Sequence, residues 1–263
     1  MVSSIFPKIL ALDFDGVICN GLLEYFQTTQ RTYQQIWPDN SENLDNFSED
    51  FYQLRPVIET GWEMVILLRA LVLDYARDQI ETDWANICQQ IIEQETLNKT
   101  SVMAQLDGVR DNWIKTDLQG WLKLHQFYPG ILLKLETVLK SATSVYIVTT
   151  KEGRFVQELL QQQGINLSEK NILGKEVKQP KYQTLRQLLQ ENSIKAEELW
   201  FVEDLLKTLQ TIQKQPDLSE IKLFLADWGY NTEQTRIIGK NDLSISLLSL
   251  EKFSQTFASW IES

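Results

Sequence analysis

Residues 9–15 read ILALDFD, and this stretch decides the fold class. The four apolar residues Ile9 to Leu12 are typical of a strand buried on both faces, and the chain leaves them at the acidic pair Asp13 and Asp15. Three later apolar runs, 145–148, 199–202 and 221–225, also end at polar or acidic residues. We therefore expect all four runs to be strands of one buried sheet.

Helical patterns separate the later strands. Leucines and a phenylalanine recur at helical spacing before Gly164, and leucines do so again between 185 and 189. Strands that alternate with helices predict an α/β fold with a doubly wound parallel sheet. A further strand at 245–248 should precede a last helix that begins near Ser249, whose hydroxyl can cap it.

About 130 residues separate the first two strands, far more than the dozen that a crossover connection needs. Apolar residues recur at helical spacing through this segment, so we predict an all-helical insertion at 21–125. The core domain is then formed by 1–20 and 126–263. Within the insertion, 39–50 is polar and turn-rich and is expected to connect helices. A turn at 128–130 should precede a helix at 131–140.

Composition excludes several classes of protein. The 263 residues carry a formal net charge of -11, which disfavours binding to nucleic acid or to anionic lipid. Cys19 and Cys88 are too few for a disulfide framework or a zinc site. The longest apolar run, 64–73, contains Arg69 and is shorter than the ~20 residues that span a bilayer. We expect a soluble, cytoplasmic protein without membrane contact.

The chemistry should lie beyond the carboxyl ends of the strands, where open parallel sheets bind their ligands. Carboxylates that meet there would repel one another unless a hard cation lay between them, and oxygen ligands suit Mg²⁺. Lys181, which follows Pro180 at the start of a helical pattern, could offset the charge of a bound phosphate. The strand-end residues are Asp13, Asp15, Thr149, Thr150, Glu203 and Asp204.

Four short motifs resemble, in order and spacing, the signature motifs of the haloacid dehalogenase-like hydrolases. They are DFDGV at 13–17, IVTTK at 147–151, Lys181 before YQTL, and FVED at 201–204. The resemblance covers roughly residues 5–20 and 127–250, and the helical insertion resembles the cap of that family. FYPGILLKL from Phe127 and ADWGY from Ala226 are similar to the phosphoglycolate phosphatase-like branch.

The resemblance implies a Mg²⁺-dependent phosphatase that acts on a small phosphorylated metabolite. Asp13 would attack phosphorus and form an aspartyl phosphate, and Asp15 would act as acid and then as base. The other implied roles are Mg²⁺ binding by Asp13, the Asp15 carbonyl and Asp204, with Glu203 as a further candidate, and phosphoryl or substrate contacts by Thr149, Thr150 and Lys181.

Three details stay open at the level of sequence. Lys178 and Lys181 flank Pro180, and Lys181 is preferred because it opens a helical pattern. The family often carries a second acid where this chain has Thr208, so either Glu203 or Asp204 could contact the metal. The spacing of Arg55, Glu59 and Glu63 places them on one helix face. This face would be either a set of solvent-exposed ion pairs along the helix or a surface of the cap that recognises the substrate.

Competing functions follow from the same motifs. A sugar phosphomutase of the family would share all of them, and the loss of the second acid is compatible with a weakly catalytic binding protein. Cleavage of carbon–halogen bonds is disfavoured because the family members with that activity lack a carboxylate at the position of Asp15.

Overall fold

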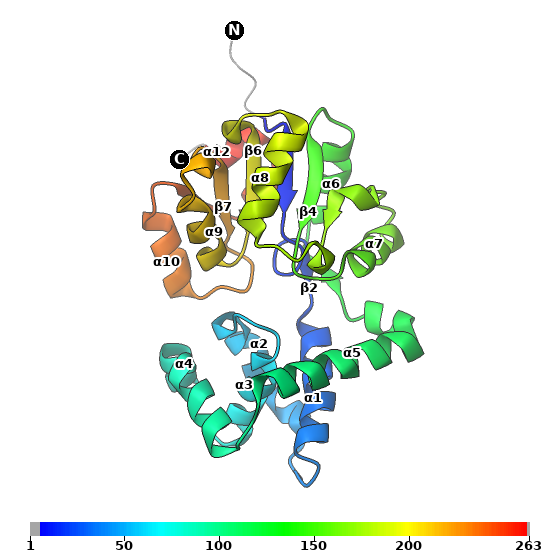
Figure 1. Ribbon diagram of the computed structural model, residues 1–263, viewed down its shortest axis with the longest axis vertical. Helices are drawn as coiled ribbons and strands as arrows, with labels where there is room; N and C mark the ends of the chain where they lie inside the picture. The colour runs from blue at the N-terminus through cyan, green and yellow to red at the C-terminus, as the bar shows by residue number, and fades with distance from the viewer. Residues whose placement is uncertain (1–5, 262–263) are drawn as a thin grey trace. The chain divides into compact units, whose positions relative to one another are not determined.

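A computed structural model describes residues 6–261 (Figure 1). The chain forms two compact units. One contains the residues up to Asn20 together with those from Gln126 onward, and the other is Gly21–His125.

The first unit is built on a six-stranded parallel sheet with the strand order β5-β4-β1-β6-β7-β8. The predicted α/β fold with a parallel sheet is therefore confirmed. The short strand β5 was not predicted from the sequence, because its two residues are too few to show a pattern. The strands are β1 (Ile9–Leu12), β4 (Ser144–Val148), β5 (Ile172–Leu173), β6 (Leu199–Glu203), β7 (Lys222–Ala226) and β8 (Ile245–Leu248).

Helices cover both faces of this sheet, as a doubly wound fold requires. On one face, alternate strand residues such as Phe201 and Leu223 pack with leucines of α8 and α9. On the other face, Trp200 and Phe224 pack against Trp260, with ring centroids 5.8 and 5.3 Å away. The helices of this unit are α6 (Ile131–Leu139), α7 (Gly153–Gln162), α8 (Lys181–Asn192), α9 (Leu206–Gln213), α10 (Glu233–Asn241), α11 (Leu250–Ser254) and α12 (Phe257–Ile261).

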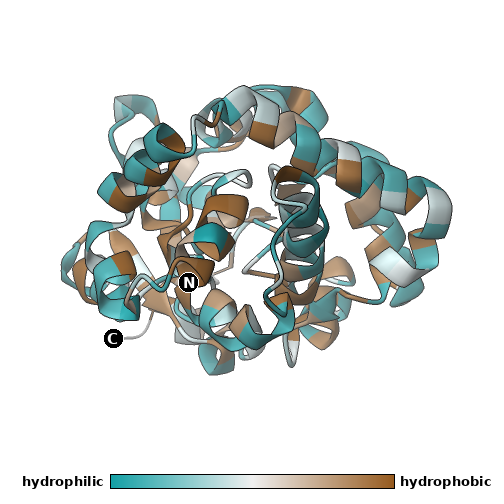
Figure 2. Ribbon diagram, turned by 90° about the horizontal axis from the view of Figure 1, so that it is seen from below, coloured by the Kyte–Doolittle hydropathy of each residue, from teal (hydrophilic) through white to brown (hydrophobic). Residues whose placement is uncertain are grey.

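The helix boundaries of this unit agree with local capping chemistry. The Ser249 side chain accepts a hydrogen bond from the Lys252 N–H and so caps α11, as predicted. Lys181 is the first residue of α8 and Pro180 precedes it. In Figure 2 several helices carry both teal and brown stretches, as expected of amphipathic helices with one buried side.

A two-stranded antiparallel ribbon marks where the chain leaves and re-enters the first unit. β2 (Cys19–Asn20) pairs with β3 (Gln126–Phe127), Cys19 opposite Phe127 and Asn20 opposite Gln126. The sequence did not predict this pairing because the strands lie more than 100 residues apart and are two residues long.

The second unit contains helices and no strand between Gly21 and His125, a segment that is described throughout. Its interior holds a buried ionic contact. The fully buried Glu24 accepts hydrogen bonds from Arg110 Nε at 2.8 Å and from Trp121 Nε1 at 3.0 Å. The α-helices are α1 (Leu22–Ile36), α2 (Ser48–Leu54), α3 (Glu63–Val72), α4 (Arg77–Gln94) and α5 (Lys99–Leu122).

Two predictions about this unit were wrong in detail. Residues 39–50 are not only a connection, because a 3-10 turn at Leu44–Phe47 leads into α2 at Ser48. The shared helix face of Arg55, Glu59 and Glu63 does not exist either. Arg55 lies in a 3-10 turn with Pro56, and α3 begins only at Glu63.

Local hydrogen bonds explain why the helix breaks there. The Glu63 carboxylate accepts from the Glu59 N–H at 3.3 Å and from the Thr60 hydroxyl at 2.5 Å, which satisfies groups at the start of α3. Across the described residues, no helix combines the length and the apolar character that crossing a membrane requires.

Candidate active site

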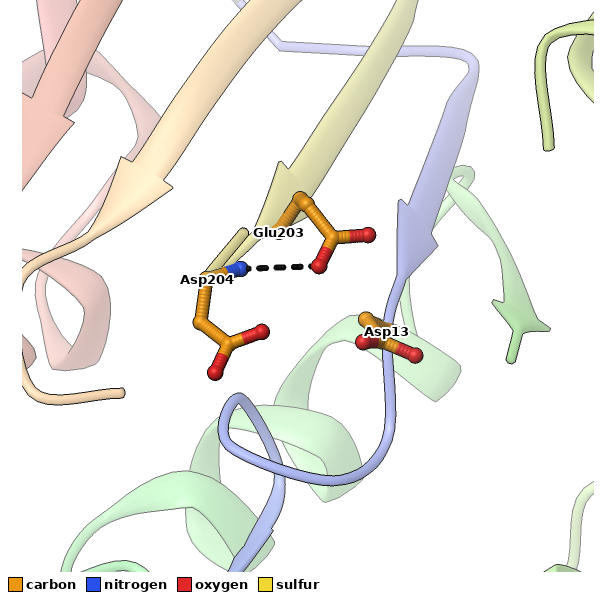
Figure 3. Close-up of side chains that lie close together, drawn as sticks. All are labelled: Asp13, Glu203 and Asp204. Atoms are coloured by element: carbon orange, nitrogen blue, oxygen red, sulfur yellow. Dashed lines mark hydrogen bonds between the residues drawn. The ribbon is translucent and has the colours of Figure 1, made fainter. Parts of the chain in front are cut away.

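Strand register brings the first and fourth motifs together. β1 and β6 are parallel neighbours with Leu12 opposite Val202, and the Asp13 N–H donates to the Val202 carbonyl at 2.9 Å. Asp13 is therefore one residue past the end of β1, beside Glu203 at the end of β6, and Asp204 follows directly. Figure 3 shows these three side chains at the ends of the two strands.

The three carboxylates form a buried cluster. Asp13, Glu203 and Asp204 are 7%, 1% and 5% exposed, and one carboxylate oxygen from each lies within 4.8 Å of the others. The cation of Lys181 joins this cluster from the start of α8. Its Nζ lies 2.9 Å from Asp13 Oδ1 and 2.7 Å from Glu203 Oε2.

Burial and mutual repulsion shift the proton affinities of the cluster. Burial, with the charge of Glu203, raises the pKa of Asp13 to about 7, although Lys181 opposes the rise. Burial and the charge of Asp13 raise the pKa of Asp204 to about 6, and burial also raises the pKa of Glu203. For Lys181 burial acts in the opposite direction, but the two neighbouring carboxylates outweigh it and its pKa is raised.

Glu203 and Asp204 differ in how protein groups engage them. Glu203 Oε1 accepts from the backbone N–H groups of Asp204 and Leu205, both at 3.1 Å, and its Oε2 accepts from Lys181. Both Glu203 oxygens are therefore committed to protein donors. In Asp204, Oδ2 accepts from the Tyr230 N–H at 2.7 Å, and the carboxylate faces Asp13 across the site (Figure 3).

Two glycines allow the backbone to approach Asp204. Gly16 has φ +86°, and a Cβ there would lie 2.0 Å from Asp204 Oδ2. A Cβ on Gly229 would lie 2.2 Å from Asp204 Cβ and 2.7 Å from the Gly16 carbonyl oxygen. No side chain fits at either position, so the two glycines fix the space around this carboxylate.

Asp15 lies apart from the buried cluster. Its side chain is 17% exposed and contacts Lys151, whose Nζ is 3.2 Å from Oδ1 and 3.4 Å from Oδ2. Asp13 and Asp15 are thus paired with different lysines. Lys151 is the last residue of the second motif, IVTTK, and its contact with Asp15 was not predicted from the sequence.

The second motif contributes one buried and one exposed hydroxyl. Thr149 follows β4, is 6% exposed, and its Oγ1 accepts from the Lys151 N–H at 3.2 Å. Thr150 is exposed. Because β4 is the other neighbour of β1, Thr149 ends at the same edge of the sheet as Asp13.

The remaining predicted residues lie elsewhere. Lys178 is exposed, with φ 53°, at the end of a 3-10 turn, whereas Lys181 lies within the carboxylate cluster. Arg55 belongs to the helical unit, where its guanidinium lies 5.2 Å from the ring centre of Tyr25 and donates to the Ile58 carbonyl.

Residues after β7 also support the site, although in the sequence the ADWGY stretch at 226–230 pointed only to a family resemblance and to no role in the site. Besides the Tyr230 N–H, the Asn231 side chain donates to the carbonyls of Asp204 at 3.1 Å and Ala226 at 2.7 Å. The signal was present, because 227–231 directly follow a buried strand that belongs to the same sheet.

The donor set fits a hard divalent cation. When fully ionised, the three carboxylates and one ammonium carry two uncompensated negative charges in a buried space, and the donor atoms are all oxygen. The cluster contains no sulfur or imidazole ligand of the kind that transition metals prefer.

Comparison with known proteins identifies the family. The family pattern described as haloacid dehalogenase-like hydrolase matches residues 68–215, which is more than half of the chain. The chain belongs to this family, so the predicted family and its class, a hydrolase, are confirmed. The matched range contains Thr149, Lys181 and Asp204, whereas Asp13 lies outside it.

Solved structures show the same fold at low sequence identity. A predicted phosphatase from Clostridium acetobutylicum is 12% identical, with 95% of this chain and 97% of that chain covered and a TM-score of 0.60. A predicted phosphoglycolate phosphatase from Haemophilus somnus is 17% identical, with coverages of 89% and 92% and a TM-score of 0.59. A haloacid dehalogenase-like family hydrolase from Streptococcus pneumoniae is 15% identical, with coverages of 93% and 94% and a TM-score of 0.57. Comparison with curated protein sequences gave no significant match.

Proposed function

We propose that this chain is a Mg²⁺-dependent phosphatase that hydrolyses small phosphorylated metabolites through an aspartyl-phosphate intermediate. The observation that carries this proposal is the buried group of Asp13, Asp204 and Lys181 at the carboxyl end of the sheet, with a second carboxylate, Asp15, two residues after Asp13. A nucleophile, a separate acid and a cation for phosphoryl oxygens are the groups that this two-step reaction needs.

Asp13 and Asp15 divide the chemistry. A carboxylate oxygen of Asp13 attacks phosphorus while Asp15 gives its proton to the leaving ester oxygen, so the P–O bond breaks and the alcohol departs neutral. Asp15, now ionised, takes a proton from water as that water attacks the aspartyl phosphate. Inorganic phosphate leaves and Asp13 is regenerated.

The other groups bind and orient the phosphoryl group. The Thr149 hydroxyl and the Lys181 ammonium contact its oxygens, and the exposed Thr150 contacts the substrate nearby. Bound Mg²⁺ supplies positive charge that offsets the negative charge on the transferring group. Asp13 and Asp204 would repel each other less with such a cation bound between them.

Asp204 is the better metal ligand of the two fourth-motif acids. Both oxygens of Glu203 accept hydrogen bonds from protein groups, so binding metal there would break the contact with Lys181 or those with two N–H groups. We propose that Asp13, Asp204 and the Asp15 carbonyl hold Mg²⁺, and that Glu203 positions Lys181 and the turn after β6.

The two units divide the work in this proposal. Residues 1–20 and 126–263 are the catalytic core, and 21–125 are a cap that selects the substrate, with Arg55 as a candidate contact. The proteins of similar fold that are named as phosphatases, one of them as a phosphoglycolate phosphatase, support a phosphomonoester as substrate. The net charge of -11 favours a small metabolite over nucleic acid.

Phosphate release from a panel of phosphomonoesters tests the proposal. Purified protein with MgCl₂ should release inorganic phosphate from p-nitrophenyl phosphate and from at least one of phosphoglycolate, sugar phosphates or nucleotides. Asp13→Asn keeps the shape of the side chain and removes the nucleophile, so the rate should fall by at least about a thousandfold. EDTA should abolish release, and excess Mg²⁺ should restore it.

Asp217→Asn is the matched control, since it makes the same chemical change at an exposed carboxylate paired with Arg186. It should keep full activity. Full activity of Asp13→Asn would refute the proposed nucleophile. A phosphate group that migrates on the substrate and is not released would identify a mutase instead.

A further inference from the structure

The contact between Lys151 and Asp15 is nearly symmetric. The ammonium Nζ lies 3.2 and 3.4 Å from the two carboxylate oxygens of Asp15. Both side chains are mostly buried, with 9% of Lys151 and 17% of Asp15 exposed. An ion pair shielded in this way is weakened less by salt than one on the surface.

The backbone of Lys151 is fixed in place. Its N–H donates to Thr149 Oγ1 at 3.2 Å, and its carbonyl accepts from the Lys175 N–H at 2.9 Å. Gly174 packs so closely that a Cβ there would lie 2.6 Å from the Lys151 carbonyl oxygen and 2.5 Å from the Gly153 nitrogen. The Lys151 side chain therefore extends from a backbone position that hydrogen bonds and close packing hold in place.

The Asp15 carboxylate has a different setting from the three buried carboxylates. Asp15 follows β1 in the turn at 13–18, and its carboxylate is outside the group of Asp13, Glu203 and Asp204. An acid that serves two proton transfers must hold one orientation while its own charge changes. A fixed cation that contacts both oxygens can keep one oxygen while the other gives or takes the proton.

We propose that Lys151 is a positioning residue that holds the Asp15 carboxyl group toward the leaving oxygen. The inference rests on the proposed phosphatase function. In the first step the Asp15 proton moves to the ester oxygen as the P–O bond breaks, and in the second step a water proton returns to Asp15. Lys151 takes part in neither proton transfer and acts only through Asp15.

The dependence of the rate on the leaving group tests this role. Phenyl phosphate needs a proton on its leaving oxygen, whereas the nitro group of p-nitrophenyl phosphate stabilises a leaving anion that needs little help from an acid. Lys151→Met removes the charge at similar length. It should lower kcat/KM for phenyl phosphate about tenfold and for p-nitrophenyl phosphate less than about twofold. Lys151→Arg keeps a cation, so its ratio of kcat/KM for phenyl phosphate to kcat/KM for p-nitrophenyl phosphate should be close to that of wild type.

The ratio for the two substrates does not depend on how much of a sample is folded, so a partly unfolded variant still gives an answer. Lys170→Met removes a charge from an exposed lysine and should leave both values unchanged. Equal losses on both substrates would overturn the proposal, because they would indicate contact with the shared phosphoryl group. Unchanged kcat/KM values on both substrates would overturn it as well. Absence of Mg²⁺-dependent release by the wild-type protein would instead refute the proposed function, and this role with it.

Discussion

Replacing Asp204 by asparagine should make the metal-free protein more resistant to unfolding as the pH approaches neutrality. The reason is the electrostatic setting of this carboxylate. Burial and the charge of Asp13 raise its pKa from an ordinary 3.8 to about 6 in the folded protein. Between these two values the folded protein binds more protons at this site than the unfolded chain does, so the free energy of unfolding falls as the pH rises.

The size of the effect follows from the same two values. Each pKa unit corresponds to about 1.4 kcal/mol, so the rise from 3.8 to about 6 costs at most about 3 kcal/mol once Asp204 is fully ionised. Most of this loss falls between pH 4 and pH 6. The asparagine side chain in the variant has the size of the aspartate and can still accept from the Tyr230 N–H, but it carries no charge.

Urea unfolding in EDTA at a series of pH values measures the effect. Between pH 4 and pH 7.5, the unfolding free energy of Asp204→Asn should rise relative to that of wild type by about 2 to 3 kcal/mol. Mg²⁺ should then reverse the order at neutral pH, because wild type gains the free energy of binding at this site and the variant gains much less.

Asp217→Asn provides a control of opposite sign. The hydrogen bond and charge of Arg186 lower the pKa of Asp217, so its removal should favour wild type at neutral pH. Parallel pH profiles for Asp204→Asn and wild type in EDTA would refute the electrostatic account. An equal gain from Mg²⁺ in both proteins would refute the assignment of Asp204 as a ligand.

Three further outcomes are expected. Gly229→Ala places a methyl group 2.2 Å from Cβ of Asp204, so it should lower stability by about 1 to 3 kcal/mol and weaken Mg²⁺ binding in a calorimetric titration. The control Gly108→Ala has open space in α5 and should raise stability by up to about 1 kcal/mol. Lys181→Met should lower phosphatase kcat/KM at least about a hundredfold, because losing one charge-stabilising group typically costs about 10²–10³ in rate. Lys178→Met should leave kcat/KM unchanged, and comparable losses in both variants would show that the third-motif assignment is wrong. Arg110→Met removes the cation beside the buried Glu24 in the helical unit and should lower the free energy of unfolding in urea by about 3 kcal/mol or more. A loss below about 1 kcal/mol would contradict the contacts described.

The sheet was predictable because its strands carry a strong and local signal. Ile9–Leu12 and Ile245–Leu248 have the predicted bounds. Ile9–Leu12 is buried throughout, and a strand covered on both faces needs an uninterrupted apolar run. The short strands β2, β3 and β5 were missed because two residues carry no periodicity. Their pairing depends on contacts between distant parts of the chain.

The candidate site was predictable as a set of strand ends but not as a network. The rule that ligands bind beyond the carboxyl ends of strands pointed to Asp13, Glu203 and Asp204. It could not tell which lysine would reach which carboxylate. The contact of Lys151 with Asp15 depends on side-chain direction after β4, and the division of labour between Glu203 and Asp204 depends on which backbone N–H groups point at them.

The helical insertion was the least predictable part. Spacing alone placed Arg55 and Glu63 on one helix, but Thr60 and Glu63 form hydrogen bonds that start α3 later in the chain. Competition between side-chain caps and helix continuation is decided by contacts that periodicity does not report.

The antiparallel ribbon of β2 and β3 makes the insertion modular. Because Asn20 lies opposite Gln126, the two exit points are about 5 Å apart, the separation that a two-residue reverse turn can bridge. A chain in which Asn-Gly replaces Gly21–His125 would keep every strand of the parallel sheet and all of the residues around Asp13. The fold is thus suited to excision or exchange of an entire helical segment, and under the proposed function such an exchange would change substrate selection without rebuilding the strands that carry the carboxylates.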